Sequence, residues 1–409
     1  MVGDGRGVSR RAALVMVVGA GAAACSGGGG GKKPAAQSPG QSGTGRAPAS
    51  VGPPPVPPPQ VVVAPDSGAG PIAPDKPVSV TVVGGRVDSV ALTVGGKELK
   101  GATSADGTGW ASTEDLDFGK TYTVKVAAVG ADGQRAEKTV EFTTLTPKRT
   151  LVGIYTPDDG TTVGVGMPVS ITFNRAVAEK AKVERLLTVT TEPAVEGSWS
   201  WLKNFDGKDR VDWRPKEYWP AGTKVRLQMK LLGVDVGDGT YGSQNRDVAF
   251  TIGRSVVTTV DTAVKRMSIV VDGAPLKTLP VSSGKPGFET WNGTMVVIGK
   301  TPSIDMNSDT VGIFGVEGYD IKDVKWDVQL TPSGTFVHAA PWNEGKFGRV
   351  NGSHGCIGMS TEDAQFFFEQ TAVGDVVTVV NSKDTVQVGN GFGCWNVAWP
   401  EWVAGSALH

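Results

Sequence analysis

The stretch HAAPWNEGKFGRVNGSHGCIGMS, residues 338–360, places two histidines and a cysteine within one short segment. The whole chain of 409 residues holds only three histidines and three cysteines. His338 stands at the end of a predicted strand, 334–340, and Cys356 lies in a glycine-rich turn just before a predicted helix. We therefore expect a strand, a thiol-bearing turn and a helix to meet here.

The predicted helix begins after Ser360, which is a good N-cap residue. Asp363 follows three positions later, acidic residues fill the first turn, and Gly374 is expected to close the helix. A thiol near a helix N-terminus gains from the helix dipole, which predicts a lowered pKa for Cys356. Backbone N–H groups beside Gly355 can form an oxyanion hole, and a histidine alongside completes a Cys–His nucleophile pair.

Three other interpretations of the same residues stay open. His338, His354 and Cys356 could supply three ligands to a zinc ion, although a single residue between His354 and Cys356 is not a common ligand spacing. A disulfide between Cys356 and Cys394 would silence the site in an oxidising compartment. The turn could also be purely structural.

Length and charge limit the remaining possibilities. A chain of 409 residues should hold more than one domain, because single cores stop growing near ~250–300 residues. The formal net charge of −1 comes from scattered charges, so we expect no nucleic-acid partner. Abundant glycine and proline favour β-structure and linkers over helix bundles.

The first residues predict export. A basic start and the apolar run AALVMVVGAGAAA are typical of a signal peptide over residues 1–25. The run stops at Cys25, which predicts lipidation of that cysteine and anchoring to the outer face of the plasma membrane, in the cell envelope. Residues 26–75 are rich in Gly, Pro, Ser and Ala and predict a disordered linker. The lipid anchor is then the only expected contact with a membrane.

The middle of the chain predicts two small β-sandwiches. Residues 121–129 and 137–145 form a hairpin pattern in the first block, 76–147, and 221–231 and 246–252 form the corresponding pair in the second, 148–253. We interpret both blocks as immunoglobulin-like β-sandwich domains without the paired cysteines of antibody domains.

The third block, residues 254–381, is mostly β with one helix. Its strands include a hairpin around Asp272-Gly273, a tight-turn pair. The tail, 382–409, is rich in tryptophan, and its indoles are expected to pack on the catalytic region, since they would otherwise form an exposed apolar patch. The fold class predicted for the whole chain is mainly β.

The segment 338–360 resembles the signature of the L,D-transpeptidases, cysteine enzymes that cross-link bacterial peptidoglycan. That signature is a histidine, about 14–17 residues, and then Ser/Thr-His-Gly-Cys; here fourteen residues separate His338 from Ser353. The linker, the two sandwich blocks and the tryptophan-rich tail are similar to those of the multidomain mycobacterial members. The resemblance covers the chain from about residue 71 to its end.

The resemblance implies a role for each motif residue. Cys356 is the nucleophile and His338 its base, with the Ala339 carbonyl orienting the imidazole. Ser353, His354 and Gly355 shape the turn or supply amides to the oxyanion. Residues expected to line the substrate cleft are Met306, Tyr319, Ser333, Gly334 and Trp342. Gly358 departs from the family, which often has Asn or Arg there, and this puts substrate preference in doubt.

The activity that the resemblance implies is 3→3 cross-linking of stem peptides through a Cys356 thioester, with no cofactor and no metal. The expected partners are a donor tetrapeptide stem, an acceptor amine from a second stem, and carbapenem-type inhibitors. Two alternatives remain: an L,D-carboxypeptidase that uses water as the acceptor, and a wall-binding lipoprotein with a degenerate site, for which Gly358 is the best support.

Overall fold

A computed structural model describes residues 56–409. The predicted signal peptide, including Cys25, lies outside the described residues. Between residues 56 and 409 no helix is both long enough and apolar enough to cross a membrane. Strands dominate the described chain, in agreement with the mainly β fold class predicted from the sequence.

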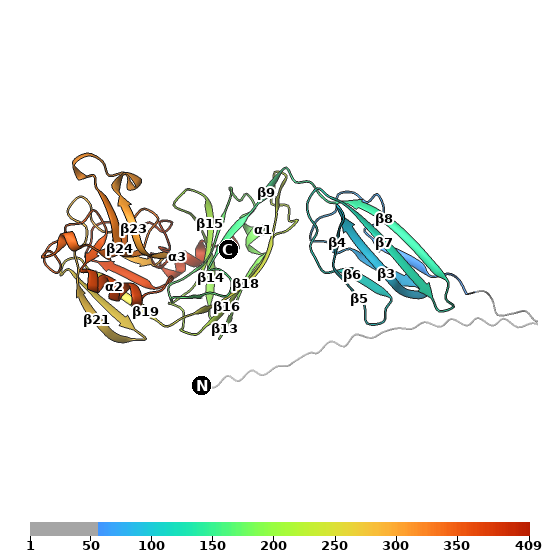
Figure 1. The fold of residues 1–409 in the computed structure, drawn as a ribbon, viewed down its shortest axis with the longest axis horizontal. Helices are drawn as coiled ribbons and strands as arrows, with labels where there is room; N and C mark the ends of the chain where they lie inside the picture. Colours follow the sequence, from blue (N-terminus) through green and yellow to red (C-terminus); the bar gives the residue numbers. More distant parts are fainter. Residues whose placement is uncertain (1–55) are drawn as a thin grey trace, which may run out of the picture. The chain divides into compact units, whose positions relative to one another are not determined.

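Two four-stranded sheets form the first sandwich (Figure 1). One sheet has the spatial order β1 (Gln60–Ala64), β2 (Ser79–Val83), β6 (Gly109–Ser112) and β5 (Gly101–Thr103). The other has the order β4 (Lys97–Leu99), β3 (Gly85–Val94), β7 (Thr121–Gly130) and β8 (Arg135–Thr143). Alternating apolar residues of both sheets meet in one core, in which Tyr122 stacks on Phe142 at 5.5 Å between ring centroids.

Strand β1 corrects the predicted linker. The composition of residues 26–75 predicts disorder throughout, but Gln60–Ala64 pairs antiparallel with β2, and Val63 is buried in the sandwich core. The run VVV, residues 61–63, is the physical reason, because it supplies an apolar side chain to the core and pairs along its backbone with β2. Ordered structure therefore begins well before residue 76.

The second sandwich repeats this architecture with a larger core. One sheet has the order β10 (Gly153–Thr156), β12 (Val169–Phe173), β15 (Asp209–Pro215) and β14 (Gly197–Lys203). The other has the order β11 (Thr162–Val163), β18 (Asn245–Ile252), β16 (Lys224–Lys230) and β13 (Leu187–Glu192). The remaining elements are the β9 (Arg149–Leu151) and β17 (Thr240–Gly242) pair and the short helix α1 (Lys180–Glu184).

The third part combines a five-stranded and a four-stranded sheet. The first has the order β21 (Ala274–Pro280), β20 (Arg266–Val271), β19 (Val256–Asp261), β27 (Val376–Val380) and β22 (Gly293–Val296). The second has the order β23 (Gly299–Asn307), β24 (Asp320–Gln329), β25 (Phe336–Ala339) and β26 (Ile357–Met359). Apolar side chains from both sheets and from helix α2 share one core.

Helix α2 (Thr361–Gln370) begins as the sequence predicts. The Ser360 hydroxyl accepts a 3.1 Å hydrogen bond from the Asp363 N–H, and Phe367 is buried under the helix. Its predicted end is wrong, because the helix stops at Gln370 with Thr371 in an extended conformation. Gly374 instead has a φ of +96° in the following turn, where its amide donates to Val297 and starts the return to strand β27.

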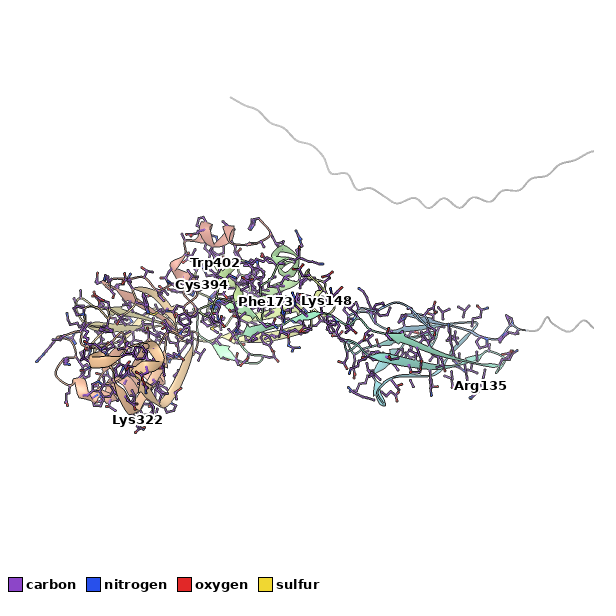
Figure 2. All side chains as sticks on the ribbon, turned by 90° about the horizontal axis from the view of Figure 1, so that it is seen from above. Arg135, Lys148, Phe173, Lys322, Cys394 and Trp402 are labelled. Atoms are coloured by element: carbon purple, nitrogen blue, oxygen red, sulfur yellow. The ribbon has the colours of Figure 1, made fainter. Side chains whose placement is uncertain are left out.

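The tail, with its short helix α3 (Trp399–Ala404) and the 3-10 turn η4 (Cys394–Asn396), contacts the second sandwich as well as the third part. Trp402 Nε1 donates to the Ser198 carbonyl at 3.0 Å, and Trp395 Nε1 donates to the Gly166 carbonyl at 2.8 Å. Figure 2 shows Cys394 and Trp402 over this sandwich. The sequence predicts packing on the catalytic region; the indoles instead lie mainly on the second sandwich, because Arg214 there offers them a cation.

Arg214 gathers the three indoles. Its guanidinium carbon lies 4.8 Å from the ring centroids of Trp395 and Trp402 and 5.3 Å from that of Trp399. The same side chain donates a 2.8 Å hydrogen bond to the Val397 carbonyl. A buried arginine with aromatic faces and carbonyls around it is stabilised by cation–π attraction and hydrogen bonds together.

Candidate active site

The parallel pair β25 and β26 brings together the two ends of the sequence motif. Val337 pairs with Ile357, His338 with Gly358, and Ala339 with Met359. Local pattern alone does not predict this pairing, since a parallel ladder joins segments about twenty residues apart in the chain. The ladder places the imidazole of His338 and the turn that carries Cys356 on neighbouring strands.

His338 is held by its backbone neighbour and by an indole. Its Nδ1 lies 2.7 Å from the Ala339 carbonyl oxygen, and its ring lies 5.8 Å from that of Trp342 in a stacked arrangement. A carbonyl can only accept, so Nδ1 carries the proton and Nε2 is left with a lone pair. Burial lowers the pKa of His338 to about 4, which keeps the imidazole neutral at physiological pH.

The turn before Cys356 is closed by Ser353. The Ser353 hydroxyl donates to the Cys356 carbonyl at 2.5 Å and accepts from the Gly355 N–H at 3.2 Å. Gly355 has a φ of +122°, a conformation that residues with a side chain rarely adopt. The Gly355 amide therefore points into the turn, which leaves the His354 and Cys356 amides as the candidate oxyanion donors.

The pKa of the Cys356 thiol is raised, whereas the sequence predicts a lowered one. Strand β26 separates Cys356 from helix α2, so the helix dipole is not directed at the sulfur. Burial instead raises the pKa of the Cys356 thiol to about 11, and the Phe336 backbone N–H offsets only part of that effect. The Sγ atom lies 3.5 Å from the Gly334 carbonyl, to which a neutral thiol can donate.

A cavity of about 240 Å³ opens over these groups. Its lining includes Met306, Tyr319, His338, Trp342, Ser353, His354, Cys356 and Gly358, all candidates from the sequence. It also includes Ile321, Ala340, Asn343 and Gly352, which the sequence interpretation missed although each lies within two residues of a candidate. Closeness in sequence to a predicted site residue was the available signal for all four.

Two predicted cleft residues take other positions. Ser333 is absent from the cavity lining, and its hydroxyl accepts a 2.8 Å hydrogen bond from Asn390 Nδ2 in the tail. Gly334 reaches the site only through its carbonyl, which faces the thiol. Gly358 does line the cavity, and a Cβ added there would lie 2.9 Å from the Ala340 Cβ. The second residue after the cysteine therefore has little room for a side chain.

His354 does not face His338 as a second base. Its ring lies 4.9 Å from that of Phe288 and 5.3 Å from that of Tyr319, and its Nε2 is 2.7 Å from the Glu317 carboxylate. Nothing in the sequence motif pointed to Glu317. Its only signal was its place two residues before Tyr319.

The structure also bears on the alternative interpretations. Cys356 and Cys394 are both free thiols, so they form no disulfide with each other. Within the described part of the chain, no three His, Cys, Asp or Glu side chains form a group that could hold a metal ion. Burial raises the pKa of Cys394 to about 12, which makes that thiol an inert core residue.

Two immunoglobulin-like sandwiches followed by a β-rich part, in which a half-buried cysteine and a buried histidine line one cavity, define the class: a multidomain β protein with a Cys–His site. The profile of the family described as "L,D-transpeptidase catalytic domain" matches residues 255–379. That of the family described as "Bacterial Ig domain" matches residues 69–235.

Two known proteins are similar in sequence to most of this chain. L,D-transpeptidase 2 of Mycobacterium tuberculosis is 37% identical over 85% of this chain and 85% of its own length. L,D-transpeptidase 5 of the same organism is 38% identical over 87% of this chain and 78% of its own length. A solved structure of the L,D-transpeptidase LdtMt1 in complex with imipenem is 30% identical, with a TM-score of 0.49 over 57% of this chain and 100% of its own. The chain belongs to the L,D-transpeptidase family.

Proposed function

We propose that this L,D-transpeptidase forms 3→3 cross-links between peptidoglycan stems through a thioester on Cys356. His338 Nε2 takes the proton from the thiol as Sγ attacks the carbonyl carbon of the third residue of a donor tetrapeptide. The bond to the terminal D-Ala breaks, and that amine leaves with the proton from His338. The side-chain amine of a second stem then attacks the thioester carbonyl and gives up a proton to His338. The C–S bond breaks, and His338 returns that proton to Sγ, which restores the thiol of Cys356.

One observation carries this proposal: a histidine and a cysteine line the same cavity, and the histidine has its free lone pair on Nε2. The 2.7 Å contact of Nδ1 with the Ala339 carbonyl fixes the tautomer, as a base that must accept a thiol proton requires. Neither group is charged at rest, so proton transfer accompanies attack. Such a neutral pair avoids the cost of two buried charges before substrate arrives.

The turn supports the oxyanion in the same scheme. Ser353 holds the Cys356 carbonyl and the Gly355 amide, so the backbone of the turn is rigid before substrate binds. Preorganised amides stabilise a developing oxyanion without reorganising during the reaction. The His354 and Cys356 amides are the donors we assign to this role.

Incubation of the purified protein with disaccharide-tetrapeptide tests the proposal. A cross-linked dimer that has lost one D-Ala, identified by mass, supports transpeptidation. Trimmed tripeptide without dimer would favour the carboxypeptidase alternative, and unchanged substrate would favour a degenerate wall-binding protein. A chelator in a parallel reaction should change nothing, because acyl transfer by a thiol needs no Lewis acid.

We also propose that the protein is exported and anchored in the cell envelope through a lipid on Cys25. The motivation is the apolar run that ends at this cysteine and the Gly/Pro-rich residues that follow it. Mass spectrometry of the mature N-terminus decides the matter. A mature chain beginning with a diacylated Cys25 is the expected result, and a chain beginning at any other residue would rule out the anchor.

A further inference from the structure

We infer that Glu317 is a positioning residue that holds the His354–Cys356 turn in its reactive geometry by linking it to the segment 308–319. The inference rests on the proposed function, because the turn matters only if Cys356 is acylated. Glu317 belongs to the 3-10 turn η2 (Gly315–Glu317), in the long connection between strands β23 and β24 (Figure 1). No family motif in the sequence includes it.

Lys285 and His354 both contact the same carboxylate oxygen of Glu317. Its Oε2 lies 2.7 Å from His354 Nε2 and forms an ion pair with the Lys285 ammonium. These contacts lower the pKa of Glu317, first through Lys285 and then through His354, so the carboxylate stays ionised. An ionised carboxylate only accepts, so the proton of the shared bond lies on His354 Nε2.

The loop that carries Lys285 also forms hydrogen bonds with the backbone of the turn. The Lys285 amide donates to the Ser353 carbonyl at 2.9 Å, and the Thr290 hydroxyl donates to the Gly355 carbonyl at 2.8 Å. Phe288 of the same loop packs edge-on against the His354 ring. Two hydrogen bonds to its backbone and one ring contact therefore fix the turn against this loop.

The segment 308–319 has fewer such contacts. The Tyr319 ring lies 5.3 Å from the His354 ring and lines the cavity, while Phe314 and Val316 project into solvent. Few buried apolar contacts mean that this segment opens at low cost. The Glu317 carboxylate links this segment to the turn through the His354 imidazole. The same carboxylate also forms an ion pair with Lys285 of the neighbouring loop.

Two consequences follow for the reaction. The His354 ring is fixed in rotation, so the His354 and Cys356 amides keep one direction toward the oxyanion. Tyr319 is kept over the cavity, so the acylated site stays shielded from water. Loss of the carboxylate should therefore slow acylation and free the imidazole, without removing any group that touches the reacting atoms.

The test compares Glu317→Ala, Glu317→Gln and Asp309→Ala. Asp309 is the matched control, since it is an exposed carboxylate of the same segment whose side chain makes no hydrogen bond or ion pair within residues 56–409. We expect Glu317→Ala to lower the second-order rate of carbapenem acylation about tenfold, as loss of a partly exposed charged hydrogen bond would. Glu317→Gln should recover part of that loss, because its amide oxygen still accepts from His354, and Asp309→Ala should match the wild type.

Nitrogen-15 NMR of the histidines supplies a readout that stability alone would not move. The chain has three histidines, so His354→Gln identifies the signal of residue 354. Glu317→Ala should shift that signal toward a mixed tautomer and leave His338 in place. Wild-type acylation by Glu317→Ala with an unchanged His354 signal, or an equal loss in Asp309→Ala, would overturn the inference. Acylation of Cys356→Ala at the wild-type rate would instead overturn the proposed function.

Discussion

His338 Nδ1 and the Ala339 carbonyl oxygen lie 2.7 Å apart, so the residue that follows the base in sequence also fixes its tautomer. The two residues sit on a buried strand whose neighbour leads out of the cysteine turn. This arrangement directs the free nitrogen of the imidazole with backbone alone, where many acid–base sites use a carboxylate. A backbone carbonyl adds no charge, which is consistent with an imidazole that burial keeps neutral.

Removal of the imidazole tests that role. We expect His338→Ala to slow acylation of Cys356 by about 10²–10⁴-fold, the usual contribution of a positioned acid–base group. Single-turnover acylation by a carbapenem, followed by intact mass, measures it. Ala339→Ser keeps the carbonyl and should stay within a few-fold of the wild type. A His338→Ala protein with wild-type kinetics would show that the thiol needs no base.

The pH dependence of alkylation tests the raised pKa of the half-buried Cys356 thiol. Burial raises the pKa of Cys356 to about 11, so the thiolate fraction should grow tenfold per pH unit across the neutral and alkaline range. In a Cys394→Ala background, the iodoacetamide rate at Cys356 should still be rising at pH 9. A plateau reached by pH 7 would mean a resting thiolate and would restore the low pKa predicted from the sequence.

Asp327 predicts a change in stability with pH. Its side chain is buried, and burial, which the backbone N–H groups of Ile304 and Asp327 offset only in part, raises its pKa to about 7. A folded pKa above the unfolded value means that stability is complete below about pH 4 and is lost as pH rises through 7. Asp327→Asn should therefore raise the free energy of unfolding at pH 8 by about 2–4 kcal/mol and have little effect at pH 4.

Denaturant titrations at the two pH values measure this difference, with the exposed Asp320→Asn on the same strand as the control. An Asp327→Asn protein less stable than the wild type at pH 8 would mean that the carboxylate has a stabilising partner.

The tail gives a prediction about packing. Trp402 is among the largest fully buried side chains, and it lies on Arg214 of the second sandwich. Trp402→Ala should lower the free energy of unfolding by about 3–5 kcal/mol. Trp342→Ala is the matched control, since that indole is 47% exposed and its loss should cost far less stability.

Truncation after Asn381 should also lower the melting temperature, and an unchanged melt would show that the tail adds nothing to the fold.

Much of the site could be predicted because its signals are local. The spacing from His338 to Cys356 and the cap at Ser360 are both properties of short segments. The hairpins of both sandwiches likewise follow from alternation and turn residues next to each other in the chain. The family resemblance added the role of each motif residue.

What could not be predicted depends on contacts between distant segments. The pKa of Cys356 is decided by burial, and burial is set by the sheets packed around the motif, not by the nearest helix. Glu317 meets His354 only because the connection between β23 and β24 folds back over the turn. The tail packs on the second sandwich, where Arg214 contacts it. Arg214 lies nearly two hundred positions before the tail in the chain, so no local pattern predicts this contact.

The central claim, that Cys356 is the nucleophile, is tested most directly by intact mass spectrometry after incubation with imipenem. Wild type and Cys394→Ala should each gain one covalent adduct, and peptide mapping should place it on Cys356. Cys356→Ala should gain none, while its melting temperature stays close to that of the wild type. A full adduct on Cys356→Ala, or an adduct that maps to another residue of the wild type, would contradict the account.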